Sequence, residues 1–212
     1  MYSRNYFYVA IFLSLVGSLV ASAAGSRTKG NVAASAEEAV PLKVGEKLPA
    51  VKVMTEAGET VKITKALEDQ ASVIVFYRGH WCPYCMKHLT ALQEIAGELG
   101  EMGVKLVAVT PDKPEYITEA KEKAKLSFDI YSDGELALAK AMGVAFQLDS
   151  KTAERYKKHL VESTGHDTGQ LPVPAVFLTD KAGGITYVFS KPDYKVRLSN
   201  EELLAEVKKA MQ

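Results

Sequence analysis

Hydrophobic residues follow the strand period and the helix period in turn along most of this chain. Short apolar runs at 72–77, 104–109 and 174–178 predict buried strands, because strands covered on both faces are nearly continuous in apolar residues. Between these runs, apolar residues recur at helical spacing, most clearly over 83–99. The alternation predicts an α/β protein with a mixed central sheet flanked by helices.

The two ends of this pattern carry clear local signals. Alternating apolar residues at 51, 53, 61 and 63 surround Gly58 and predict an N-terminal β-hairpin. Ser199 and Glu202 form a capping box that predicts a C-terminal helix. Asp112 is placed to cap a helix over 113–124, and the mostly polar stretch 145–171 is expected to contain one surface helix.

The N-terminal segment does not resemble part of a folded domain. Arg4 precedes the apolar run Tyr6–Val20, and the small residues Ala21-Ser22-Ala23 follow it. This order predicts a secretory signal peptide over 1–23, a disordered linker over 24–40 and one domain over 41–212. An uncleaved membrane anchor is the alternative. The protein is therefore expected outside the cytoplasm, periplasmic or secreted, where thiols tend to be oxidised.

The overall charge balance limits the kinds of partner. The chain has 47% hydrophobic and 25% charged residues, which is typical of a globular domain, and its formal net charge is zero. A neutral chain gives no long-range attraction toward polyanions. Neither a nucleic acid nor an anionic membrane surface is therefore expected as a partner.

The only two cysteines, Cys82 and Cys85, are separated by two residues and follow the apolar run 72–77. Cys82 is expected at the N-cap of the next helix, with Pro83 at the first helical position. The free N–H groups and the positive dipole end of that helix favour a thiolate. The pair is therefore predicted to be a redox centre in which Cys82 is the nucleophile and Cys85 is the resolving thiol.

Other interpretations of the cysteine pair are weaker. A structural disulfide over so short a loop restrains the unfolded chain little, and a zinc site needs four ligands where this motif supplies two. A copper-binding module that uses Cys82, Cys85 and a distant histidine remains the alternative from another class. The surface histidines are His159 and His166, and His80 is a candidate for tuning the pKa of Cys82. No resident metal and no cofactor are predicted.

Three motifs carry a resemblance to a known family: Phe76-Tyr-Arg-Gly-His-Trp-Cys-Pro-Tyr-Cys85, Val107-Ala-Val-Thr-Pro-Asp112 and Leu171-Pro-Val-Pro-Ala175. Together they resemble the peroxiredoxin-like branch of the alkyl hydroperoxide reductase/thiol-specific antioxidant (AhpC/TSA) family, which has a thioredoxin fold. The resemblance implies a thiol-dependent antioxidant oxidoreductase that reduces peroxides or protein disulfides. It also implies a thioredoxin-like electron donor as the partner that restores the dithiol.

The chain departs from the family pattern around the cysteines. The family motif Pro-x-x-x-Thr-x-x-Cys places its peroxidatic cysteine on Cys85, its threonine on Cys82 and its proline on Arg78. The arginine that the family carries before the later strand falls on Pro174. Arg78 is a candidate for the missing positive charge, although a surface arginine in an ion pair is the simpler expectation.

Features typical of thioredoxins are better kept. Trp81 precedes Cys82, as in many thioredoxins, and Val173-Pro174 matches their cis-proline dipeptide. We therefore expect a cis bond at Pro174, close to the Cys82 sulfur. In that arrangement the backbone N–H and C=O of Val173 would be free to pair with a substrate segment.

Overall fold

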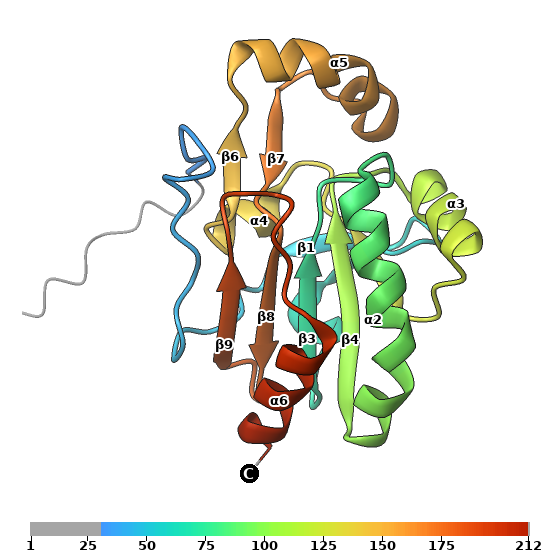
Figure 1. The fold of residues 1–212 in the computed structure, drawn as a ribbon, viewed down its shortest axis with the longest axis vertical. Helices are drawn as coiled ribbons and strands as arrows, with labels where there is room; N and C mark the ends of the chain where they lie inside the picture. Colours follow the sequence, from blue (N-terminus) through green and yellow to red (C-terminus); the bar gives the residue numbers. More distant parts are fainter. Residues whose placement is uncertain (1–30, 212) are drawn as a thin grey trace, which may run out of the picture.

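The computed structural model describes residues 31–211, which form a mixed seven-stranded sheet covered by helices on both faces (Figure 1). The strand order is β2-β1-β5-β4-β3-β8-β9, and β6 and β7 form a separate two-stranded sheet. The predicted α/β class and the mixed sheet are confirmed. The predicted signal peptide, 1–23, lies outside the described residues.

The centre of the sheet is made of three strands: β3 (Ala71–Phe76), β4 (Val104–Thr110) and β8 (Ala175–Thr179). β3 runs parallel to β4 and antiparallel to β8, so that Phe76 lies beside both Val109 and Ala175. The end of β3, the end of β4 and the start of β8 therefore meet at one end of the sheet, which we call the cysteine end because Cys82 and Cys85 follow β3.

Alternate residues of the central strands enter two separate cores. Val73 and Val75 face one core, and Ile74 and Phe76 face the other. The first core is covered by α2 (Pro83–Glu101), α3 (Pro114–Ala124) and α6 (Asn200–Ala210). The second is covered by α1 (Ile63–Ala66), α4 (Ala137–Ala141) and chain from residues 32–51. Burial on both faces explains why β3 is apolar throughout.

The sheet edges agree with the hairpin signals. β1 (Lys52–Met54) and β2 (Thr60–Lys62) form the predicted antiparallel hairpin, and β1 also pairs with β5 (Asp129–Ser132). On the opposite edge, β9 (Ile185–Ser190) returns antiparallel to β8. The capping box of Ser199 and Glu202 is present at the start of α6. The N-cap of α3 is Lys113, so the predicted cap at Asp112 is wrong.

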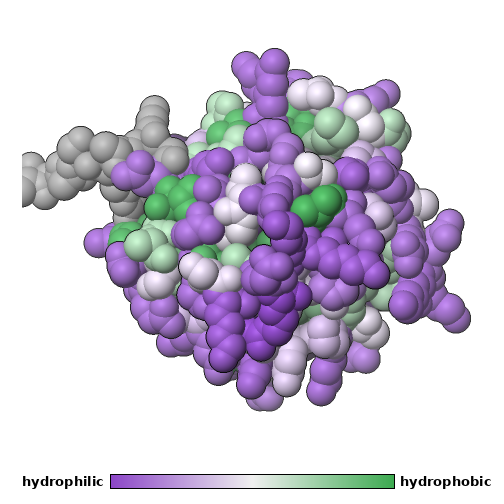
Figure 2. Space-filling view, turned by 90° about the horizontal axis from the view of Figure 1, so that it is seen from above, coloured by the Kyte–Doolittle hydropathy of each residue, from purple (hydrophilic) through white to green (hydrophobic). Residues whose placement is uncertain are grey.

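A polar insertion stands over the cysteine end. It consists of β6 (Ala145–Gln147), α5 (Ser150–Thr164) and β7 (Gln170–Pro172), and α5 is the predicted surface helix. Seen from above, this face of the molecule is mainly hydrophilic, with small separate hydrophobic patches (Figure 2). Beneath it, Leu148, Leu160 and Leu171 form a small core that also touches Trp81. The insertion therefore packs directly on the loop that carries the cysteines.

The described part of the predicted linker, 31–40, lies along this insertion. Ala33 donates its N–H to Ala145 O at 2.9 Å and accepts from Gln147 N at 2.9 Å, and Val32, Ala36 and Ala39 pack on the second core. Farther on, a Cβ at Gly143 would meet Val40 O at 2.1 Å, so only glycine allows this crossing. These contacts differ from the disordered linker expected over 24–40.

Candidate active site

The cysteine pair lies at the N-terminus of α2, as the sequence predicts. Cys82 is the N-cap in an extended conformation, and Pro83 occupies the first helical turn. The Cys82 carbonyl accepts hydrogen bonds from Cys85 N and Met86 N, both at 3.0 Å. The two sulfurs are free thiols 2.6 Å apart, and each residue is only 1% exposed. A disulfide can therefore form here without a large backbone movement, whereas a substrate reaches Cys82 only when neighbouring side chains move.

The two thiols differ in acidity although they touch. The pKa of Cys82 is lowered to about 6, first by the hydrogen bond from the Cys85 thiol and then by the charges of Arg78 and Arg197, against the effect of burial. The pKa of Cys85 is raised, first by burial and then by its bond to Cys82. At neutral pH the pair therefore consists of a Cys82 thiolate and a Cys85 thiol.

Arg78 is buried, which contradicts the expectation of a surface arginine in an ion pair. It is 3% exposed, and its guanidinium carbon lies 5.1 Å from the ring centroid of Trp81, 4.9 Å from that of Tyr156 and 4.3 Å from that of Tyr194. These rings come from the cysteine loop, α5 and the segment before α6. The sequence places them far apart, so their convergence on one cation depends on the tertiary fold.

Arg197 is a site residue to which the sequence analysis gave no role. Its Nη2 donates a hydrogen bond to Cys85 Sγ at 3.5 Å, across 112 positions of the chain. It supplies positive charge at the cysteines although the position that carries the family arginine is Pro174. In the sequence, Asp193-Tyr194 with Arg197 resembles the C-terminal region of the AhpC/TSA family, but that resemblance indicates no role for the arginine.

His80 is held by an acid and does not point freely into solvent. Asp112, fully buried, accepts a hydrogen bond from His80 N at 2.6 Å and lies 3.3 Å from His80 Nδ1. The bond to Asp112 raises the pKa of His80. Tyr116 stacks on the imidazole at 4.6 Å between ring centroids. Asp112 thus fastens the loop before Cys82 to the end of β4, in place of the helix cap predicted for it.

Trp81 packs beneath the polar insertion. Its ring stacks on His159 at 5.4 Å and lies 5.0 Å from Tyr156, both from α5. His159 is exposed, as expected, and His166 is half-buried at the surface. His166 pairs with Glu135 at 3.2 Å. Neither of these two histidines joins the cysteines in a cluster of potential metal ligands.

The expectation at Val173-Pro174 is wrong in its geometry. No peptide bond among the described residues is cis, so Pro174 is trans. Val173 is 1% exposed, and its N–H donates to Val144 O at 2.8 Å. The insertion of β6, α5 and β7 occupies the backbone group that was expected to bind a substrate strand. The strand that follows Pro174 is nevertheless the neighbour of the strand that precedes the cysteines, because Ala175 pairs with Phe76.

Within residues 31–211, no three histidine, cysteine, aspartate or glutamate side chains are grouped so that they could hold a metal ion. The copper-binding alternative therefore has no third ligand beside the cysteines in this part of the chain. Nor does any described helix have the length and apolar content needed to cross a membrane.

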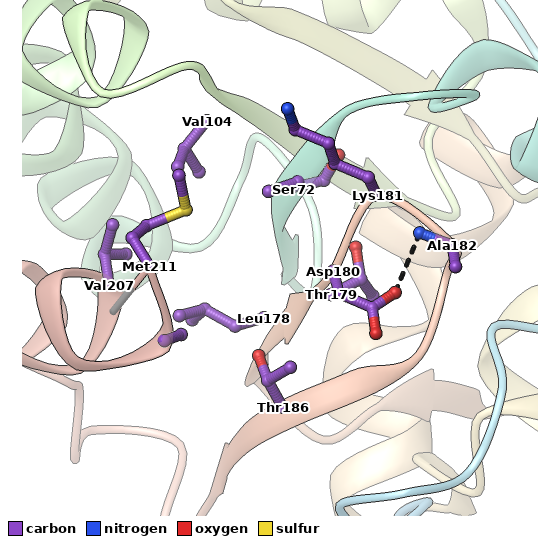
Figure 3. Close-up of a pocket in the computed structure, with 12 residues that line it drawn as sticks. Ser72, Val104, Leu178, Thr179, Asp180, Lys181, Ala182, Thr186, Val207 and Met211 are labelled. Atoms are coloured by element: carbon purple, nitrogen blue, oxygen red, sulfur yellow. Dashed lines mark hydrogen bonds between the residues drawn. The ribbon is translucent and has the colours of Figure 1, made fainter.

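A hollow lies at the opposite end of the sheet from the cysteines. It has a volume of about 400 Å³, and Leu178, Val207 and Met211 supply much of its apolar wall (Figure 3). Asp180 at its rim bonds to the N–H of Ala182. Its lining includes neither a cysteine nor a histidine.

The AhpC/TSA family profile matches residues 44–188. Among curated proteins, the chain is 30% identical to peroxiredoxin Bcp of Escherichia coli K12 over 104 residues, which is 49% of this chain and 66% of that protein. It is 28% identical to peroxiredoxin Bcp of Bacillus subtilis over 103 residues, 49% of this chain and 65% of the relative. The matched region thus spans just under two thirds of these relatives.

Solved structures show the same fold at lower identity. Peroxidoxin BcpB from Mycobacterium tuberculosis superposes with a TM-score of 0.62 and 18% identity, over 79% of this chain and 97% of that one. A peroxiredoxin-like protein from Aquifex aeolicus gives a TM-score of 0.63 and 22% identity, over 80% and 88%. These likenesses confirm the predicted thioredoxin-like fold.

Proposed function

Since the chain belongs to the AhpC/TSA family, we propose that it is a peroxiredoxin-like thiol peroxidase that works through a Cys82–Cys85 dithiol. The observation that carries this proposal is the asymmetry of the pair. Cys82 has a pKa of about 6 and Cys85 a raised pKa, at a sulfur separation of 2.6 Å. One sulfur is thus ready to attack at neutral pH, and the other is held beside it as a protonated reserve.

The proposed reaction begins at Cys82. Its thiolate attacks one oxygen of a hydroperoxide, the O–O bond breaks, and the leaving alkoxide or hydroxide takes a proton from solvent. Cys82 becomes a sulfenic acid, the first step of thiol oxidation. Arg78 and Arg197 favour the thiolate by their charge. They thereby supply the electrostatic help that the missing threonine and arginine of the family motif would give.

Cys85 then completes the oxidation. Its thiolate attacks the Cys82 sulfur, water leaves, and the Cys82–Cys85 disulfide forms. The 3.5 Å hydrogen bond from Arg197 favours ionisation of Cys85 for this step. The sulfurs are already close, so α2 does not have to unfold. A thioredoxin-like dithiol donor would restore the reduced pair in two thiol–disulfide exchanges, and protein disulfides would be alternative oxidants for the same dithiol.

Single-cysteine variants test this assignment. Cys82→Ser should abolish peroxide consumption, and Cys85→Ser should form the Cys82 sulfenic acid and trap mixed disulfides with the donor. Peroxide loss and insulin reduction, measured side by side with a thioredoxin system, identify the preferred substrate. If Cys82→Ser keeps peroxide consumption while Cys85→Ser loses it, the roles are reversed and follow the family alignment.

We also propose that the protein is exported. The support is the order of basic residue, apolar run and small-residue site at the N-terminus. Cell fractionation and mass determination of the mature N-terminus test this. Cleavage after Ala23 with the protein outside the cytoplasm is expected. An intact N-terminus in the cytoplasmic fraction would contradict export, and an intact N-terminus in the membrane fraction would favour the anchor.

A further inference from the structure

The segment 191–199, between β9 and α6, crosses the first core at the cysteine end (Figure 1). Most of its side chains are exposed. Its inward residues are Tyr194, Arg197 and Leu198, of which Leu198 is buried in the first core. Just after the segment, Asn200 Nδ2 donates to Ala91 O on α2 at 2.8 Å. The C-terminal side of the segment is therefore well anchored, whereas its N-terminal side depends on Tyr194.

The ring of Tyr194 contacts two side chains next to the cysteines: Arg78, in the loop before α2, and Tyr84, in the first turn of α2. The Arg78 guanidinium carbon is 4.3 Å from its centroid, the shortest of that cation's three ring contacts. On another side, the ring of Tyr84, which lies between the two cysteines in sequence, meets it edge-on at 5.7 Å and 82°. Both contacts depend on the aromatic face, because an aliphatic side chain has no quadrupole to attract a cation or a ring edge.

Arg197 has little else to fix its position. Its Nη1 donates to the carbonyl of the adjacent Val196 at 2.9 Å, which moves together with the same segment. Its Nη2 donates the 3.5 Å hydrogen bond to Cys85 Sγ. The placement of its guanidinium on that sulfur therefore depends on where the backbone of the segment lies.

We propose that Tyr194 is a positioning residue of the redox pair: its ring, held between Arg78 and Tyr84, fixes the segment 191–199 so that Arg197 stays on the Cys85 sulfur. The inference deepens the proposed function, because Arg197 in this position speeds the attack of Cys85 on oxidised Cys82. Tyr194 touches neither sulfur in this account and acts through Arg197.

A small aromatic disulfide, 5,5′-dithiobis(2-nitrobenzoate), separates the two steps without any peroxide. The Cys82 thiolate attacks one of its sulfurs, forms a mixed disulfide and releases the first thionitrobenzoate. The Cys85 thiolate then attacks the Cys82 sulfur, closes the disulfide and releases the second. Stopped-flow absorbance of the reduced protein follows both releases, so the test stands even if the protein proves not to be a peroxidase.

Tyr194→Leu should slow the second release about tenfold at neutral pH and the first much less, since losing the aromatic contacts frees the segment that carries Arg197. Tyr194→Phe keeps the ring and should match the wild type, as should Lys191→Ala at the exposed start of the same segment. Arg197→Gln should reproduce the slow second release. The combined variant should be no slower than the slower single variant.

Several results would overturn the proposal. These are an unchanged second release in Tyr194→Leu, an equal slowing of both releases, or effects that multiply in the combined variant. Thermal melting shows whether each variant is folded. If Tyr194→Leu fails to fold, Tyr194→Met provides apolar volume without an aromatic face, and a normal second release in that variant would equally contradict the proposal.

Discussion

The two ends of the central sheet differ in what they bury. At the cysteine end, where β3 and β4 finish and β8 begins, two thiols, Arg78 and Asp112 are all 3% exposed or less. At the other end, the hollow of about 400 Å³ is walled mainly by side chains such as Val104, Leu178 and Val207 (Figure 3). The same strands supply both ends, so the fold alone does not determine which end is reactive. The reactive end is the one at which charged and nucleophilic groups are buried together.

Unpartnered polar atoms follow the same division. Among the described residues, buried polar atoms without a hydrogen-bond partner gather near the cysteines: Tyr77 Oη, Arg78 Nε, Trp81 Nε1 and Asp112 Oδ1. In the wall of the opposite hollow, Thr186 Oγ1 is such an atom. Burying polar groups without partners costs free energy. At the cysteine end, reactive groups are therefore buried at a cost in stability. Substitutions there should change the reactivity of the thiols, whereas substitutions at the opposite end should change stability alone.

Replacing Arg78 should produce the largest change. Arg78→Met keeps a long apolar side chain but removes the charge that contributes most, among charges, to the lowered pKa of Cys82. We expect that pKa to rise by about one unit from about 6 and the thiolate fraction, and with it alkylation of Cys82 at pH 6, to fall about fivefold. Iodoacetamide kinetics between pH 5 and 9 measure both changes.

Arg155 provides a matched control for this experiment. Its guanidinium also lies on the Tyr156 ring, at 5.2 Å, but from the exposed side of α5. Arg155→Met should leave the alkylation profile unchanged. If Arg155→Met and Arg78→Met shift the profile equally, the effect belongs to the packing of Tyr156 and not to the charge beside Cys82.

Much of this contrast could be predicted from sequence because it depends on local signals. The apolar run 72–77, Pro83 after Cys82 and the capping box at Ser199 each act within a few residues, and each has its predicted consequence. Periodicity and capping thus gave the central sheet and the position of the cysteines.

The surroundings of the thiols depend on distant contacts, and there the sequence was insufficient. Arg197 reaches Cys85 across 112 positions, and Arg78 is buried only because Tyr156 and Tyr194 fold over it. The cis bond expected at Pro174 came from analogy with thioredoxins. The polar insertion changes that site, because Val144, just before β6, takes the N–H of Val173.

His88 should make the cysteine end sensitive to acid. Burial, helped by the charge of Arg197, lowers its pKa from 6.5 to about 4. Between these values the unfolded chain binds a proton that the folded protein does not. The resulting stability is therefore complete above pH 6.5 and is lost as the pH falls to about 4. The loss should reach about 3 kcal/mol in the free energy of unfolding.

Urea unfolding of the reduced protein between pH 7 and 4 measures this loss. Burial raises the pKa of Asp133 to about 6, so this carboxyl gains stability as the pH falls over the same interval. The contribution of His88 is therefore the difference in unfolding free energy between the wild type and His88→Leu, which should change by about 3 kcal/mol from pH 7 to pH 4. His166→Gln, at the surface beside Glu135, is the control and should keep the wild-type slope. A His88→Leu variant that loses stability as steeply as the wild type would show that another group causes the acid sensitivity.

Substitutions in the hollow at the opposite end of the sheet should have the smallest effect, and one of them should raise the stability of the protein. Thr186 Oγ1 is buried without a partner in the wall of the hollow, so Thr186→Val removes an unsatisfied hydroxyl and should stabilise the protein by up to about 1 kcal/mol. Ser72 lines the same hollow, but its hydroxyl donates to Gln70 O at 3.2 Å. Ser72→Ala should therefore cost about 1 kcal/mol.

Neither variant should change the alkylation rate of Cys82. If Thr186→Val alters that rate, the two ends are coupled through β8 and β9, and the division of chemistry from scaffold fails.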